Sequence, residues 1–217
     1  MYYGHLRHCP VCDNSARRFR SFGSVPREEA ECPHCGALER HRLLWLYLQK
    51  NTDLLDGRTK KMLHIAPERC LESRLRKCVG DGYLTADIVK VRAMVEMDIT
   101  NIQYADRTFD AIYCSHVLVY IPDDGKAMRE LHRILKKDGW AILLEPINSE
   151  KTVDDPSIVE TEDRFKVRKY GPDYLDRLRD AGFSVKVTKI HDLIPKDQAI
   201  RFGLSQSDDE IYYCTKN

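Results

Sequence analysis

The sequence predicts an α/β fold: a doubly wound, mostly parallel seven-stranded sheet with helices on both faces, preceded by a small N-terminal zinc-binding module. After residue 60, short apolar runs alternate with amphipathic helical runs, and several of the apolar runs end in acidic or polar residues. Before residue 38, two Cys-x-x-Cys pairs indicate a metal-binding module. We therefore divide the chain into a zinc-binding module (1–37), a linking helix and junction (38–59) and the sheet domain (60–217).

The length and composition are those of an ordinary globular protein. The chain has 217 residues, of which 42% are hydrophobic and 32% charged, and its formal net charge is +1. This charge gives no overall reason to expect strong binding to nucleic acid or membranes. No apolar run approaches the roughly 18–20 residues of a membrane helix, and the first residues lack the apolar core of a signal peptide. We expect a cytoplasmic protein that does not bind membranes.

The strands and helices are expected as alternating elements. Seven strands are expected at 61–68, 82–87, 93–98, 109–116, 139–146, 183–190 and 210–216. Helices are expected at 36–51, 69–78, 124–137 and 172–181. The helix at 124–137 has the clearest signals, because Asp123 or Asp124 can cap its start and Gly139 follows its end. The polar segment 147–170 is too long for a simple connection and is a candidate lid or substrate loop.

Four cysteines form a candidate metal site. The pairs Cys9/Cys12 and Cys32/Cys35 have residues 13–31 between them, a spacing typical of structural zinc sites. Each tight turn presents two thiolates to one ion, and Zn²⁺ prefers four ligands in a tetrahedron. Four protein ligands leave no open coordination position, so the zinc would be structural and not catalytic. A redox pair or unrelated thiols are the alternatives.

The remaining cysteines and the nearby histidines are expected to have no role in this site. Scattered cysteines of a reduced protein are usually inert core residues, which describes Cys70, Cys78, Cys114 and Cys214. Four histidines near the pairs can in principle replace a thiolate, but we expect them to be exposed instead: His5, His8, His34 and His41.

A row of polar side chains at the strand ends predicts a small-molecule cleft. In an open parallel sheet, the carboxyl ends of the strands line one crevice, and ligands bind there. The residues in question are Glu68, Asp87, Asp98, Ser115 and His116.

The first strand of this row is followed by a segment without glycine, His64 to Cys70. A dinucleotide-binding domain would carry Gly-x-Gly-x-x-Gly here. Pro67 has no N–H to offer a phosphate and Glu68 would repel one, so NAD, FAD and nucleoside triphosphates are disfavoured. Glu68 suits a cationic group, Asp87 a ribose, and Asp98 an exocyclic amine. S-adenosylmethionine, a nucleoside with a cationic amino-acid tail and no phosphate, satisfies all three.

Residues 61–146 also resemble the class I S-adenosylmethionine-dependent methyltransferases, particularly the broad type 11 group. YLTAD, ending at Asp87, resembles their ribose-binding motif, and Met97-Asp98-Ile99 their adenine-binding motif. FDAIYCSHVLVYIPDD (109–124) resembles their fourth-strand motif, and ELHRILKKDGWAILLEP (130–146) matches their helix–turn–strand. The resemblance covers about residues 60–215 and implies a Rossmann-like fold. A zinc module before this fold also resembles ribosomal-RNA guanine methyltransferases.

The first motif departs from the family. His64 stands in place of the family's acid, and Ala66, Glu68 and Cys70 stand in place of its glycines. The resemblance and the strand-end pattern together assign the cofactor to His64, Ala66, Pro67, Glu68, Asp87, Ile88, Asp98, Ile99 and Ser115, and make His116 the candidate catalytic base. Instead of contacting the cofactor, Asp87 and Asp98 could merely end strands or cap helices. Cys114 is expected to be a buried core residue and not a nucleophile.

The predicted activity is methyl transfer from S-adenosylmethionine to an acceptor by in-line displacement. A small-molecule acceptor is favoured, and RNA recognised through the zinc module is an alternative. A non-catalytic, zinc-stabilised binding protein with a degenerate methyltransferase fold is the competing hypothesis, motivated by the missing glycines. An anionic acceptor would be met by Arg164, Lys166, Arg168, Lys169 and Tyr170, unless these form a solvated loop.

Overall fold

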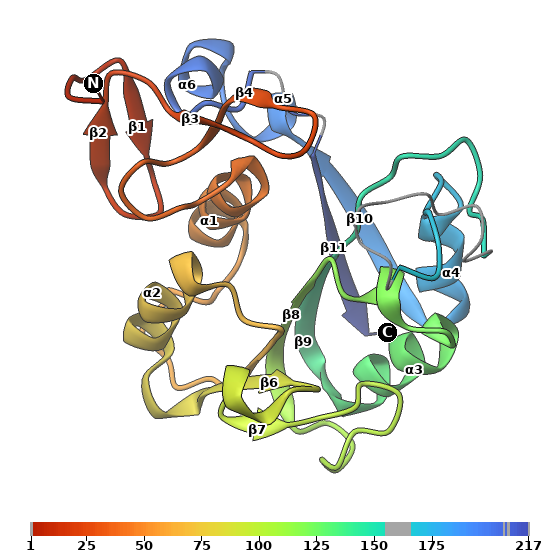
Figure 1. Ribbon diagram of the computed structural model, residues 1–217. Coiled ribbons are helices and arrows are strands. Elements are labelled where there is room, and N and C mark those ends of the chain that lie inside the picture. The colour runs from red at the N-terminus through yellow and green to blue at the C-terminus, as the bar shows by residue number, and fades with distance from the viewer. Residues whose placement is uncertain (1, 155–165, 206, 208, 217) are drawn as a thin grey trace. The chain divides into compact units, whose positions relative to one another are not determined.

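The computed structural model describes residues 2–154, 166–205, 207 and 209–216 (Figure 1). By their contacts they form two compact units. The N-terminal unit comprises Met1–Arg58, Glu68–Gly80 and Thr188–Ile211, and the sheet unit comprises Thr59–Pro67, Asp81–Val187 and Tyr212–Asn217. This grouping differs from the division made on the sequence, which stays a prediction. Each unit is described separately below.

A seven-stranded sheet forms the centre of the fold. Its strands are β5 (Met62–Ile65), β6 (Tyr83–Asp87), β7 (Val95–Glu96), β8 (Phe109–Ser115), β9 (Leu135–Leu144), β10 (Phe183–Lys189) and β11 (Glu210–Lys216). They lie in the order β10-β11-β9-β8-β5-β6-β7. All neighbours from β9 to β7 are parallel, whereas β11 is antiparallel to β9. The predicted α/β class with a mostly parallel seven-stranded sheet is confirmed.

Helix α3 (Asp124–Ile134) shows why the sequence signals at this position were informative. Asp123 caps its start, because the Asp123 side chain accepts a hydrogen bond from the Lys126 N–H at 2.8 Å. Its apolar stripe, which includes Met128 and Leu131, is fully buried. At its other end the Lys216 ammonium donates to the carbonyls of His132, Arg133 and Leu135. Figure 1 shows α3 beside α4 (Tyr174–Asp180).

Several expected element boundaries were wrong. The helix expected over 124–137 ends at Ile134, and the strand expected from Gly139 begins at Leu135. Leu135 pairs with Phe109 of β8, so sheet pairing extends the strand into the lysines that looked like a helix end. Strand β7 has two residues instead of the expected six. Asp98 therefore lies two residues beyond the end of the strand and does not end it.

Among its described residues, the N-terminal unit has two hairpins and four α-helices. The hairpins are β1 (Arg7–Cys9) with β2 (Asn14–Ala16), and β3 (Arg20–Phe22) with β4 (Arg27–Glu31). The helices are α1 (Glu39–Asn51), α2 (Arg69–Val79), α5 (Ile190–Leu193) and α6 (Lys196–Arg201). The hairpins, α5 and α6 were not predicted, because elements of three to six residues are too short to show a period.

A buried arginine ties this unit together. The Arg42 side chain on α1 is 0% exposed and donates to the carbonyls of Ala30, Ala37, Phe202 and Gly203 at 2.6–3.0 Å. A guanidinium has five N–H donors in a rigid fork, so these carbonyls compensate much of the cost of burying its charge. The contacts join residues about 160 positions apart and explain why the segment 188–211 belongs to this unit.

Within the described part of the chain, no helix combines the length and the apolar character needed to cross a membrane. The cytoplasmic location stays a prediction.

Candidate functional site

The strand order reverses between β5 and β8, and this reversal locates the candidate cofactor site. β5 lies between β6 and β8, both parallel to it. Chain connections leave β5 and β8 in opposite directions at their carboxyl ends, which opens a crevice that ligands of this fold class occupy. Ala66 follows β5, Asp87 ends β6, His116 follows β8, and Glu145 follows the neighbouring strand β9. The sheet thus brings together side chains that are far apart in the sequence.

Ala66 follows β5 in a left-handed backbone conformation, with φ of +48°. Its N–H donates to the Ala86 carbonyl of β6 at 2.8 Å, which holds it against the neighbouring strand. Left-handed geometry costs a non-glycine residue about 1–2 kcal/mol. Glycine adopts this geometry without that cost, and this chain adopts it with alanine.

Asp87 ends β6 and is half-buried. Its Oδ1 accepts a hydrogen bond from the Val89 N–H at 2.8 Å, and its carbonyl accepts from the Met97 N–H at 3.0 Å. Asp98 is exposed, and its Oδ1 accepts from the N–H and hydroxyl of Thr100, both at 2.8 Å. Both turns use one oxygen of a carboxylate that can accept several hydrogen bonds. These hydrogen bonds to the following residues are a structural role, the alternative to cofactor contact. They also fix the direction of each carboxylate.

The other predicted cofactor residues differ in accessibility. His64 is fully buried: its Nδ1 lies 2.7 Å from the Tyr83 hydroxyl and its ring 4.9 Å from that of Tyr113. Ile99 is buried, whereas Ile88 is 66% exposed. Pro67 is half-buried.

Ser115 ends β8, and His116 directly follows it. Ser115 is buried, and among the described residues its hydroxyl has no hydrogen-bond partner. Such an orphaned group calls for an explanation, and a ligand or water at the sheet edge supplies one. His116 is half-buried with φ of +56°, and its N–H donates to the Leu144 carbonyl at 2.8 Å. Strained residues of this kind cluster at functional sites.

Glu145, directly after β9, is a candidate that the sequence reading missed. It is 6% exposed, and its Oε1 accepts from the N–H groups of Val117 and Leu118 at 2.9 and 2.7 Å. Burial raises the pKa of Glu145 to about 8, although these N–H donors oppose the shift. The signal was present in the sequence, because Glu145 follows an apolar strand as Asp87 does.

The segment expected to meet an anionic acceptor has another role where it is described. Arg168 is buried, and it donates to the carbonyls of Leu118 and Ile121 and to the Asp154 carboxylate. The Tyr170 hydroxyl donates to Asp124 at 2.6 Å. Both side chains hold the chain that follows β8, so neither belongs to a solvated loop. Lys166 and Lys169 are half-buried, and Arg164 lies outside the described residues.

The four cysteines come together in the N-terminal unit. Their sulfur atoms all lie within 4.8 Å of one another, with Cys9 and Cys35 at 3.7 Å and Cys12 and Cys32 at 3.8 Å. A tetrahedron with Zn–S bonds of about 2.3 Å has edges of about 3.8 Å, so the spacing fits zinc. It is far longer than the roughly 2.05 Å of a disulfide.

Glu68 and one of the histidines expected to be exposed also meet in this unit. The expectation was wrong for His41, which is 4% exposed and lies with its Nε2 3.5 Å from Glu68 Oε1. His5 and His34 are exposed as expected, and His8 is half-buried. Cys70, the other unusual residue of the first motif, lies with its sulfur 3.3 Å from His41 Nδ1.

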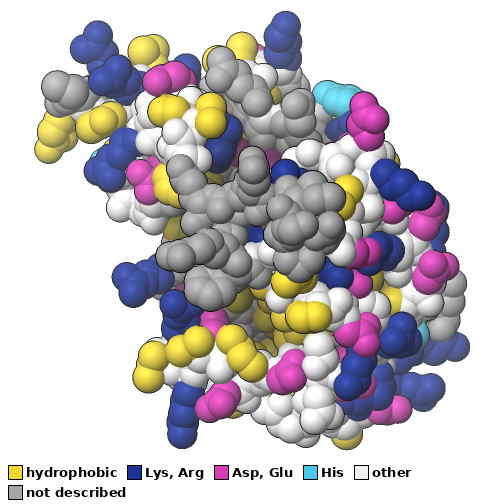
Figure 2. Space-filling model, turned by 45° about the vertical axis from the view of Figure 1, so that its right-hand side comes forward, with side chains coloured by type: hydrophobic (Ala, Val, Ile, Leu, Met, Phe, Trp, Pro, Cys, Tyr) yellow, Lys and Arg dark blue, Asp and Glu magenta, His cyan; other side chains and the backbone are white. Residues whose placement is uncertain are grey.

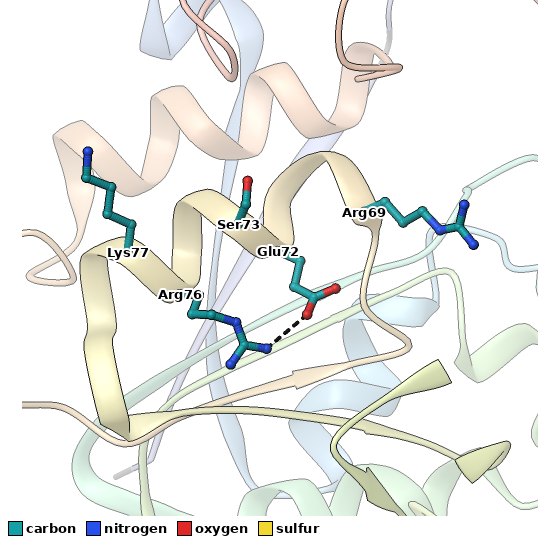
Figure 3. Close-up of a pocket in the computed structure, with 5 residues that line it drawn as sticks. All are labelled: Arg69, Glu72, Ser73, Arg76 and Lys77. Atoms are coloured by element: carbon teal, nitrogen blue, oxygen red, sulfur yellow. Dashed lines mark hydrogen bonds and ion pairs between the residues drawn. The ribbon is translucent and has the colours of Figure 1, made fainter. Parts of the chain in front are cut away.

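A separate pocket of about 380 Å³ opens on α2 and contains none of the predicted site residues. Figure 3 shows Arg69 at one end of the helix, Lys77 at the other, and Ser73 between them. Glu72 and Arg76 form an ion pair at 2.9 Å, one helical turn apart. We assign no ligand to this pocket.

Comparison with known proteins finds a methyltransferase-domain match within part of the chain and a shared fold. A family model described as a methyltransferase domain matches residues 60–143. The search of curated proteins finds no significant match.

Three solved structures are similar over most of the chain. An S-adenosylmethionine-dependent methyltransferase from Mesorhizobium loti has a TM-score of 0.56 at 13% identity, over 78% of this chain and 96% of that one. The PH0226 protein from Pyrococcus horikoshii has a TM-score of 0.54 at 17% identity, over 81% of this chain and 88% of that one. The [4+2]-cyclase SpnF has a TM-score of 0.53 at 18% identity, over 81% of this chain and 80% of that one. At these identities the likeness shows the fold alone, and the cyclase shows that this fold supports other chemistry.

The left-handed backbone at Ala66 predicts that Ala66→Gly stabilises the protein by about 0.5–1 kcal/mol. Relief of about 1–2 kcal/mol of strain exceeds the roughly 0.5–1 kcal/mol of extra backbone entropy that glycine loses on folding. Urea denaturation measures the difference. The control is Ala86→Gly, which removes a buried methyl group from regular strand β6 and should destabilise. Equal destabilisation by both changes would contradict the strain.

The raised pKa of Glu145 predicts a pH-dependent effect of Glu145→Gln. The folded state holds this proton up to about pH 8, whereas the unfolded state releases it near 4.5, so wild-type stability falls as the pH rises between these values. Relative to the variant, the wild type should lose about 2–3 kcal/mol between pH 5.5 and 7.5. Denaturation at both pH values tests this. Glu150→Gln, on an exposed carboxylate, should show no such trend, and a flat difference for Glu145→Gln would refute the shift.

Proposed function

We propose that this protein is an S-adenosylmethionine-dependent methyltransferase whose acceptor is a small molecule. The observation that carries the proposal is the position of Asp87, which ends the strand next to β5 on the side away from the order reversal. An acid at this place in a doubly wound sheet takes ribose hydroxyls. The domain match at 60–143 adds independent support.

The bound cofactor would supply a methyl group on a sulfonium, which is already a good leaving group. The chain would contribute orientation and exclusion of water. Asp87 would hold the ribose, Asp98 the adenine amine, and Glu68 the ammonium of the methionine tail. Ile88 and Ile99 would contact the adenine, and the remaining cofactor contacts are proposed for His64, Ala66, Pro67 and Ser115.

A base is required only where the acceptor loses a proton before attack. His116 is the proposed base, because it directly follows β8 at the carboxyl end of the strand and histidine is the commonest general base in enzymes. Its strained backbone supports the assignment, since such strain persists where function requires a fixed direction. Glu145 would act through the chain that follows His116, by holding the N–H groups of Val117 and Leu118.

Two alternatives make different predictions. RNA recognised through the cysteine module predicts copurifying RNA and a steep loss of affinity with salt. On the face in Figure 2, Lys/Arg and Asp/Glu side chains are interspersed, so that face offers no continuous basic surface. A non-catalytic binding protein predicts no binding of S-adenosylmethionine. The comparisons do not favour it, and a degenerate cleft has no need of two acids.

The cofactor assignment predicts that Asp87→Ala weakens binding of S-adenosylhomocysteine by about 100-fold or more. Hydrogen bonds to a charged group contribute about 1.5–3 kcal/mol each, and this change removes the acceptors of two ribose hydroxyls. Titration calorimetry measures the affinity. Asp81→Ala is the matched control: Asp81 is exposed beside the amino end of β6 and should leave affinity unchanged. Wild-type affinity in Asp87→Ala would sink the assignment.

We also propose that Cys9, Cys12, Cys32 and Cys35 hold one structural zinc ion. Emission spectroscopy should then find about one zinc per chain. Cys32→Ser should lower both zinc content and the melting temperature, because metal binding contributes to folding free energy. Cys78→Ser, at an exposed cysteine of α2, should change neither. Full zinc content in Cys32→Ser would contradict the proposed ligand set.

A further inference from the structure

The segment that joins β6 to β7 exposes an unusual amount of apolar surface. Among the described residues, ten large apolar side chains are exposed, and four of them lie between Ile88 and Met94. Ile88 is already a proposed cofactor contact. The other three have no part in the proposed cofactor site and are 42%, 91% and 53% exposed: Val89, Val91 and Met94. Exposed apolar side chains that gather in one place mark an interaction surface, unlike ones that are scattered singly.

Hydrogen bonds hold this segment to the sheet unit at both ends. The Val89 N–H donates to the Asp87 carboxylate at 2.8 Å. The Met94 N–H donates to the hydroxyl of Thr85, a buried residue of β6, at 2.9 Å. Between these points, the Arg92 N–H donates to the Val89 carbonyl at 2.9 Å. The segment is therefore an ordered surface, which loses less conformational entropy when it binds a partner.

The same segment leads into the edge strand of the sheet. β7 pairs with β6 and ends the strand order, so among the described strands none covers its other side (Figure 1). An uncovered edge is a template for pairing with another chain. Apolar side chains next to such an edge increase the area that a partner can bury. The edge and the apolar segment together form one surface, which we call the β7 surface and define as residues 89–96.

The charges of the β7 surface are arranged so that it complements itself. Lys90 and Arg92 come first in the chain and Glu96 comes last; all three are exposed, and no ion pair joins any of them to another described residue. A second copy related by a two-fold axis runs in the opposite direction, so its acidic end meets the basic end of the first copy. Each such contact then occurs twice. A surface of a single sign would repel its own copy, whereas this one attracts it.

We propose that the β7 surface is the contact between two copies of this chain, with Arg92 of each copy against Glu96 of the other. The inference goes beyond the proposed function and does not depend on it. The surface excludes Asp87 and Asp98, which keep their proposed cofactor roles. A standard interface takes about 20–30 residues a side, and the β7 surface is much shorter than that. The dimer is therefore weak, with a dissociation constant in the micromolar range.

Sedimentation equilibrium on the full, zinc-loaded chain tests the proposal over a concentration series. Wild type should pass from monomer to dimer as the concentration rises through the micromolar range. Val91→Ser should weaken dimerisation by about tenfold or more, because a two-fold contact loses the apolar side chain twice. Val25→Ser is the matched control: Val25 is 81% exposed in the N-terminal unit, and its replacement should leave dimerisation as in wild type.

Charge reversal tests which side chains meet across the axis. Arg92→Glu brings acids together in both contacts, and Glu96→Arg brings cations together, so each variant alone should dimerise at least about tenfold more weakly than wild type. An equal mixture of the two variants should dimerise as wild type does, because both contacts then join opposite charges. Both side chains are exposed, so we expect wild-type melting temperatures for both variants.

Three outcomes overturn the inference. A wild-type chain that stays monomeric throughout the series would show that the β7 surface binds no second copy. Equal dimerisation of wild type and Val91→Ser would place the contact elsewhere on the molecule, and this comparison decides even where a charge variant fails to fold. Folded charge variants whose mixture does not recover dimerisation would show that Arg92 and Glu96 do not meet across the axis.

Discussion

The parallel pairing of β5 with both β6 and β8 is the constraint on which the candidate site depends. β5 has four residues, all buried, and it pairs along its whole length on both sides. In a parallel sheet all carboxyl ends meet at one edge, so this pairing brings the residues after β5, β6 and β8 together. Without it, Ala66, Asp87 and His116 would be unrelated positions in the sequence.

Pairing within the sheet also maintains strain at two of these positions. Ala66 and His116 both have a positive φ, and in both the N–H extends the sheet by donating to a neighbouring strand, to Ala86 and Leu144. Each residue is therefore held in an unfavourable conformation by a hydrogen bond that would be costly to lose in a buried sheet. The two positions flank the order reversal. We interpret the strain as the consequence of directing the chain away from the sheet on each side.

The sequence predicted correctly those features that depend only on residues close together in the chain. The Asp123 cap of α3 and the acid ending β6 were both predicted, because capping and strand ends depend on neighbouring residues. It failed where distant residues decide. The start of β9 at Leu135 depends on pairing with Phe109, and the burial of Arg168 depends on carbonyls of Leu118 and Ile121. No local pattern contains that information.

The cysteine module and the altered motif are best understood as parts of one arrangement. A glycine-rich loop recognises a ligand through its backbone, which needs no support from elsewhere. In this chain two of those positions carry side chains instead, and Glu68 Oε1 lies 3.5 Å from His41 Nε2. His41 is in turn anchored through Leu38 beside the second cysteine pair. The departure from the glycine motif is therefore accompanied by side-chain contacts with the helix that follows the second cysteine pair.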